Sequence, residues 1–179
     1  MRMATATKRW TLAEVHSLPD DGNKYELVRG ELFVTPPPNI GHELISARLT
    51  RLLDPFAEAH GLGYVFHPRA VLRFDQSEVE PDLMVRHGPT PTAPSWDNAP
   101  TPSLVVEIHS GSTRRRDQLQ KRSLYMDAGV PEYWMVDPER RVVTVVRAGQ
   151  PDAVTGSALV WSPAGTDASL AIDVATLFD

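Results

Sequence analysis

An acidic residue inside an apolar strand constrains this chain more than any other feature of its sequence. Residues 103–109 read Ser-Leu-Val-Val-Glu-Ile-His, and alternation along a strand places Glu107 and His109 on the face opposite Ile108. A carboxylate buried in such a strand costs several kcal/mol unless it is paired, hydrogen-bonded or bound to a cation. The fold must therefore supply Glu107 with a partner.

A second acid follows the same pattern. Asp82 directly precedes an apolar run in the segment Glu-Pro-Asp-Leu-Met-Val at residues 80–85. Two acids on neighbouring strands fit a site for Mg²⁺ or Mn²⁺, which prefer carboxylate oxygens and water, and such a cation can act on a phosphodiester. The structural alternatives are that Asp82 caps a loop and that Glu107 pairs with an arginine.

Basic residues gather on the helix predicted after the Glu107 strand. Lys121 lies one turn beyond Asp117, and it could supply the fixed cation that phosphoryl transfer needs near an attacking water. An i, i+4 pair between Asp117 and Lys121 is the alternative. The same segment carries three consecutive arginines that either contact nucleic-acid phosphates or form a solvated helix face. These are Arg114, Arg115 and Arg116.

The order of elements predicts a single mixed α/β domain over residues 10–179, preceded by a flexible N-terminus at residues 1–9. Helical patterns cover residues 11–19, 40–60 and 113–128, the last with Leu119, Leu124 and Tyr125 facing inward. Strand patterns cover residues 25–28, 31–34, 63–67, 70–74, 80–85, 103–109, 132–136, 141–147, 158–161 and 169–172.

Composition limits the kind of protein further. The 179 residues include no cysteine, which excludes disulfides, thiolate metal sites and cysteine nucleophiles. The net charge of −5 argues against coating of nucleic acid by bulk positive charge. The sequence has neither the apolar run of a signal peptide nor that of a membrane-spanning helix, so we expect a cytoplasmic protein with no membrane contact.

The combined motifs resemble the Uma two family, the former domain of unknown function 820, within the PD-(D/E)XK nuclease superfamily. The likeness runs from about Trp10 to Phe178 and includes the hairpin at residues 25–32 and His42 at the start of the long helix. The motifs that carry it are Pro81-Asp82, Val105-Val106-Glu107-Ile108, Ser110 to Thr113, Asp117, Lys121, Tyr125, Gly129-Val130-Pro131-Glu132-Tyr133-Trp134 and Val136-Asp137-Pro138.

The resemblance implies a restriction-endonuclease-like core, in which a central mixed sheet is flanked by helices and joined by an N-terminal hairpin. It also implies that Asp82 and Glu107 hold Mg²⁺ or Mn²⁺. Lys121 would replace the superfamily lysine that usually stands two residues after the glutamate. His109 occupies that slot here, as a further metal ligand, a proton carrier or a partner of Glu107.

Three auxiliary residues follow from the same likeness, and one of them is Asp117, a turn before Lys121. Glu26 resembles the acid of the family's hairpin, although it could instead pair with an arginine. His42 could approach the site from the first long helix, although a histidine near a helix start is commonly a local hydrogen-bonding group. Gly111 stands where the family usually has a proline.

The resulting hypothesis is a divalent-metal-dependent endonuclease that hydrolyses DNA phosphodiester bonds. A homodimer is the economical arrangement for cutting both strands of a duplex. The alternative from another class is a catalytically silent nuclease-fold module that binds nucleic acid or protein. A hydrolase of some other phosphoester fits the same metal site.

Overall fold

The computed structural model describes residues 8–88, 95–109 and 114–179, and for residues 114–118 only the backbone. Several sequence-based predictions therefore lie outside the described residues. These are the predictions for residues 1–7 of the N-terminal segment expected to be flexible, for Ser110 to Thr113 of the family likeness, and for the side chains of Arg114, Arg115, Arg116 and Asp117.

A six-stranded mixed sheet forms the centre of the protein, with the strand order β10-β9-β8-β7-β6-β3. β7 pairs antiparallel with β6 on one side and parallel with β8 on the other. The parallel pair needs a crossover connection, which helix α3 (Arg114–Asp127) provides. The strands are β3 (Tyr64–Phe66), β6 (Leu83–Arg86), β7 (Leu104–Ile108), β8 (Tyr133–Asp137), β9 (Val142–Val146) and β10 (Ala153–Thr155).

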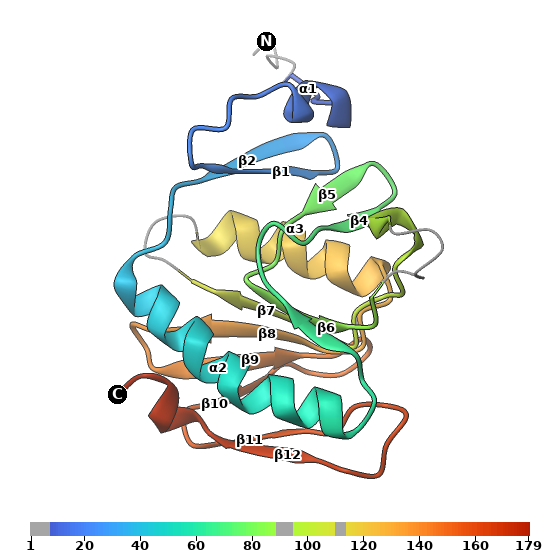
Figure 1. Cartoon of the computed structure of the whole chain (residues 1–179). Helices are drawn as coiled ribbons and strands as arrows, with labels where there is room; N and C mark the ends of the chain where they lie inside the picture. The colour runs from blue at the N-terminus through green and yellow to red at the C-terminus, as the bar shows by residue number, and fades with distance from the viewer. Residues whose placement is uncertain (1–7, 89–94, 110–113) are drawn as a thin grey trace.

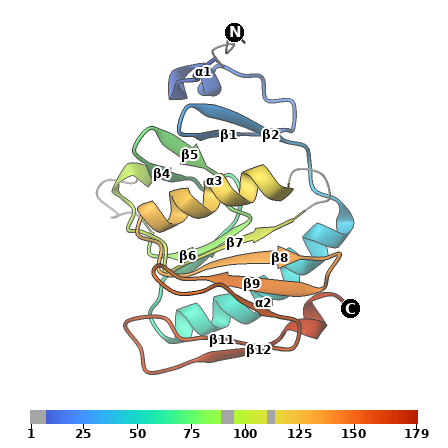
Figure 2. The ribbon, with the colours of Figure 1, turned by 180° about the vertical axis from the view of Figure 1, so that it is seen from behind.

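Helices cover both faces of this sheet, as Figures 1 and 2 show. The 20-residue helix α2 (Ile40–Ala59) packs on one face, and α3 packs on the other. The alternation predicted for β7 is confirmed, because Val106 and Ile108 join the core against α2 while Val105 joins the core against α3. Glu107 therefore faces α3. The predicted fold class, a mixed α/β protein with a central sheet flanked by helices, is confirmed.

A four-stranded sheet lies on the far side of α3, with the order β2-β1-β5-β4 (Figure 1). It contains the predicted hairpin of β1 (Lys24–Val28) and β2 (Glu31–Thr35), together with β4 (Leu72–Phe74) and β5 (Ser77–Val79). Helix α3 is thus enclosed between two sheets.

The strand predicted at residues 80–85 is confirmed only from Leu83 onward, because residues 80–82 belong to neither sheet. β5 ends at Val79 in the four-stranded sheet, and β6 begins at Leu83 in the six-stranded sheet. Pro81 lies between the two strands. Because proline has no backbone N–H group, it cannot donate a hydrogen bond to a neighbouring strand, and the pairing is interrupted there. Asp82 therefore stands at the point where the chain crosses from one sheet to the other.

One further prediction is corrected by the packing of α3. Leu119 was expected to face inward but is 65% exposed, because the buried face of α3 is set by Lys121, Leu124 and Tyr125. The three-residue strands β5 and β10 were not predicted from the sequence.

The remaining elements complete the fold around α2 and the hairpin. Helix α1 (Leu12–His16) lies within the helix predicted at residues 11–19 and begins with a capping box of Thr11 and Glu14. The hairpin of β11 (Ala158–Trp161) and β12 (Leu170–Asp173) leads into the short helix η2 (Val174–Leu177), and η1 (Trp96–Asn98) precedes β7. None of the helices described is long and apolar enough to cross a membrane.

Candidate functional site

A cleft of about 470 Å³ opens where β7 ends and α2 begins. Its lining comes from both sheets and both long helices, so it joins segments that are far apart in the sequence. The lining side chains discussed below are Lys24, His42, Glu80, Asp82, Glu107, His109 and Lys121.

Asp82 and Glu107 are neighbours because of the register between β6 and β7. Leu83 pairs with Val106, so one step further along the antiparallel ladder places Asp82 opposite Glu107. The backbone N–H of Ile108 donates to Oδ2 of Asp82 at 2.8 Å, which fixes the carboxylate at the end of the ladder. The side chains of Asp82 and Glu107 are 9% and 8% exposed.

Lys121 is the partner that Glu107 requires. Its Nζ donates to Oε1 of Glu107 and to Oε1 of Glu26, both at 2.9 Å. The hydroxyl of Tyr125, one helical turn further on, donates to the same Glu107 oxygen at 2.5 Å. Glu26 also accepts from the backbone N–H of Glu80 at 2.8 Å. Within the part of the chain whose side chains are described, the cation that Glu26 and Glu107 share is therefore a lysine and not the arginine considered for each.

Asp82 has two cationic or polar partners of its own. Lys24 Nζ donates to Oδ1 of Asp82 at 3.3 Å and to the backbone oxygen of Glu80 at 2.9 Å. Nε2 of His42 lies 3.1 Å from Oδ2 of Asp82. His42 thus reaches the site from the first turn of α2, as the family likeness implied.

Burial and charge together set the pKa values in the cleft. Burial alone would lower the pKa of Lys121, but the charges of Glu107 and Glu26 outweigh it and raise that pKa well above its usual range. Burial raises the pKa of Glu107, and the nearby Lys121 only partly offsets this effect. For Asp82, Lys24 and His42 overcome the effect of burial and hold the pKa well below its ordinary value. Asp82 is therefore ionised and Lys121 charged at neutral pH.

The structure also locates a site residue that sequence reasoning missed. Lys24 lies two positions before Glu26 on β1, so both side chains leave the same face of the strand. That spacing was visible in the sequence, but nothing in it showed that β1 would bring Lys24 to Asp82. Tyr125 was expected only as a core residue, and its hydroxyl contacts Glu107.

His109 lines the cleft just beyond the end of β7. Its backbone N–H donates to the carbonyl of Val136 at 2.9 Å, which continues the parallel pairing of β7 with β8. The three arginines and Asp117 lie in the first turns of α3, where only the backbone is described, so the structure does not test their predicted roles.

The donor set of the cleft fits a hard divalent cation. Among the residues described, no three aspartate, glutamate or histidine side chains gather tightly enough to enclose a metal ion. Mg²⁺ is commonly held by one or two carboxylates, with water and substrate oxygens completing its shell. Asp82 and Glu107, opposite each other in an open cleft, match that mode of binding.

Comparisons with known proteins bear on the fold and on the family. No protein with a curated description matches the sequence. A crystal structure described as that of "a putative nuclease belonging to DUF820 from Anabaena variabilis ATCC 29413" superposes with a TM-score of 0.78 at 20% sequence identity. The alignment covers 94% of this chain and 97% of the other, which shows a shared fold. The sequence also matches the Uma2 family, described as "Putative restriction endonuclease", over residues 12–175, so the chain belongs to that family.

Proposed function

We propose that this protein is a divalent-metal-dependent nuclease that hydrolyses phosphodiester bonds in DNA. The observation that carries the proposal is the pair of opposed carboxylates, Asp82 and Glu107, in an open cleft with a fixed lysine beside them. Membership of a family described as restriction endonucleases supports the same reading.

Asp82 and Glu107 are the residues that would hold Mg²⁺ or Mn²⁺. When bound, such a cation supplies Lewis-acid polarisation of a phosphate oxygen and lowers the pKa of water. The chain contributes by holding the two carboxylates in place. The N–H of Ile108 and the ring of His42 orient Asp82, and Tyr125 orients Glu107.

Lys121 is the positively charged side chain that we assign to the reaction. Its ammonium group is already held in place by Glu26 and Glu107, so the side chain needs little rearrangement when substrate enters the cleft. A lysine fixed in this way orients an attacking water and stabilises the negative charge that develops on the phosphate. Glu26 acts through Lys121 and is a positioning residue.

A catalytically silent module remains the second candidate, and one observation favours it. Both proposed metal ligands already have lysine partners within the chain, Lys24 for Asp82 and Lys121 for Glu107. The carboxylates are therefore compensated without any metal ion. A protein that only binds nucleic acid or another protein would use the same arrangement to stabilise its fold.

A cleavage assay separates the two candidates without requiring a known recognition sequence. The substrate is a random-sequence duplex DNA library, incubated with Mg²⁺ or Mn²⁺, and new strand ends are counted by sequencing. Wild type should cleave, and Glu107→Gln should lose at least about 100-fold of the rate. The control is Glu132→Gln, because Glu132 is another buried glutamate but bonds Trp134 and Arg147 outside the cleft.

Two results would contradict the nuclease proposal. One is metal-dependent cleavage that is equally fast in wild type and in Glu107→Gln. The other is folded wild-type protein that binds the library but produces no new ends above background, which would establish the silent module.

We also propose a homodimer, and the molar mass from light scattering at the protein concentrations used for cleavage tests it directly.

A further inference from the structure

A second hollow of about 280 Å³ adjoins the catalytic cleft, and His42 and His109 line both. Its walls come from α2, from the turn between β8 and β9, and from the last residues of the sequence. Arg48 enters it from α2, and Arg141 enters it from the turn. The proposed cleavage chemistry uses neither arginine.

Both arginines are bound to one short segment of the chain. Arg48 donates from Nη1 to the backbone oxygen of Leu177 at 3.0 Å and from Nη2 to the backbone oxygen of Asp179. Arg141 donates from Nη1 to the backbone oxygen of Phe178 at 3.0 Å, and its Nη2 lies 2.8 Å from Oδ1 of Asp179. Two guanidinium groups therefore converge on the oxygens of residues 177–179.

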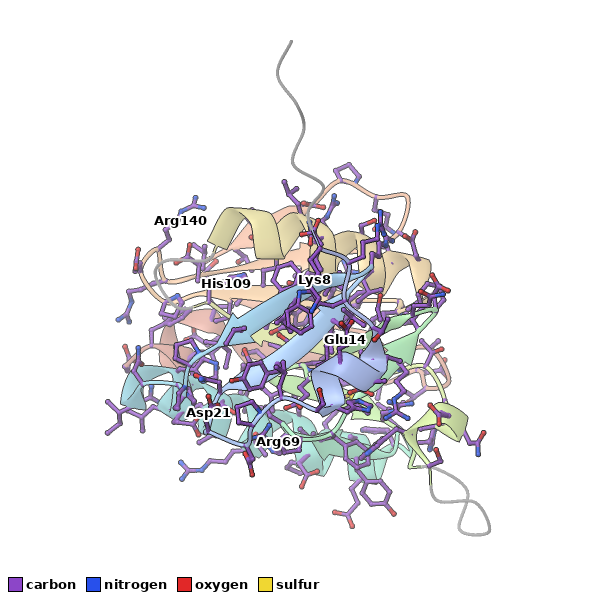
Figure 3. The ribbon with its side chains drawn as sticks, turned by 90° about the horizontal axis from the view of Figure 1, so that it is seen from above. Lys8, Glu14, Asp21, Arg69, His109 and Arg140 are labelled. Atoms are coloured by element: carbon purple, nitrogen blue, oxygen red, sulfur yellow. The ribbon has the colours of Figure 1, made fainter. Side chains whose placement is uncertain are left out.

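The topology places this arginine pair at the same edge of the sheet as Asp82 and Glu107. β7 and β8 are parallel and end at the same edge of the sheet, so the turn after β8 flanks the end of β7 that carries Glu107. The first turn of α2 lies at the same edge (Figure 1). Arg140, exposed on this turn, points to the same side of the molecule as His109 in Figure 3.

The chemistry of the hollow fits a phosphate group. A guanidinium presents a planar fork of N–H donors that matches phosphate oxygens and carboxylate oxygens equally well. The ion pair of Arg141 with Asp179 is exposed on both sides, at 52% and 70%, and such exposed pairs contribute little stability. A ligand phosphate can therefore displace the Asp179 carboxylate from Arg141 at little cost.

We propose that Arg48 and Arg141 form a binding subsite for a backbone phosphate of the substrate strand, next to the phosphodiester that is cleaved. In the free protein, Asp179 occupies this subsite and competes with the substrate. The inference rests on the proposed function, since it assigns a second point of contact to the same nucleic-acid ligand.

Binding of a fluorescently labelled random-sequence DNA duplex tests this subsite without any need for cleavage. Anisotropy is measured in EDTA over a range of NaCl concentrations. Arg48→Gln and Arg141→Gln should each weaken binding, and each should reduce the slope of log K against log salt by about one. Asp179→Asn should tighten binding about 3- to 10-fold, because it removes the competing charge while keeping both arginines. That gain cannot arise from damage to the fold.

The control is Arg73→Gln, because Arg73 also pairs with an exposed aspartate, Asp97, but lines neither hollow. Its affinity and salt slope should equal those of wild type. If wild type binds and both Arg48→Gln and Arg141→Gln keep its affinity and slope, the subsite is refuted while the nuclease proposal stands. If folded wild type binds neither the duplex nor a single strand, the nucleic-acid function itself is refuted, and the subsite with it.

Discussion

Replacing Lys121 with methionine should destabilise the protein strongly, because it leaves two buried carboxylates without their shared cation. The side chains of Lys121, Glu26 and Glu107 are 10%, 1% and 8% exposed. Two unit charges about 4 Å apart attract by about 4 kcal/mol at an effective dielectric constant of about 20. Loss of one partner of a buried ion pair typically costs about 3 to 5 kcal/mol. Methionine keeps the apolar stem, so the change isolates the charge.

Urea-induced unfolding followed by circular dichroism measures this loss. We expect the free energy of unfolding to fall by about 3 kcal/mol, the lower end of that range, because Lys24 remains as a second cation in the cleft. The double variant with Glu26→Gln should recover part of the loss, with a coupling energy of about 2 kcal/mol. Equal midpoints for wild type and Lys121→Met, or a coupling energy near zero, would refute the reasoning.

Three further changes have defined outcomes. Lys24→Met removes the cation beside Asp82 and should tighten Mn²⁺ binding by about tenfold in isothermal titration calorimetry; unchanged affinity would show that this lysine does not compete with the metal. Gly63→Ala should lower the free energy of unfolding by about 3 kcal/mol or more, because Gly63 has a positive φ of 97° and the added Cβ would lie 2.2 Å from a backbone oxygen of β6. The same change at Gly61, where nothing lies within 4 Å of the added Cβ, should lower it by about 1 kcal/mol. Leu53→Ala, at a fully buried position, should lower the free energy of unfolding by about 2 to 5 kcal/mol, whereas Leu119→Ala should change it by less than about 0.5 kcal/mol. Equal losses would contradict the assigned faces of α2 and α3.

Local pattern predicted the elements of this fold well, and it failed where the chain changes sheets. The alternation in residues 103–109 correctly placed Glu107 on the face opposite Ile108, because a strand buried on both sides leaves little freedom of register. The strand predicted at residues 80–85 begins too early because Glu80, Pro81 and Asp82, which link β5 to β6, directly precede the apolar run of β6. Which sheet each strand joins depends on pairing with distant segments, and that information is absent from the local sequence.

Some residues of the candidate site were likewise predicted from the sequence, and others were not. Asp82, Glu107 and Lys121 were predicted from the likeness to a known family and from the cost of burying charge, and the structure brings them together in one cleft. Lys24 was missed because its role depends on where β1 lies relative to β6. Leu119 was misplaced because the ion pairs of Lys121, rather than the apolar stripe alone, set the rotation of α3.

Diffraction from crystals soaked in Mn²⁺ tests the central claim most directly, since it requires no knowledge of the substrate sequence. An anomalous difference map should show a peak within about 2.0 to 2.4 Å of carboxylate oxygens from both Asp82 and Glu107. In that state, Lys24 should have moved away from Asp82. Ordered, solvent-accessible carboxylates with no peak at saturating Mn²⁺ and with both lysine contacts intact would contradict the claim. That result would assign the cleft a purely structural role.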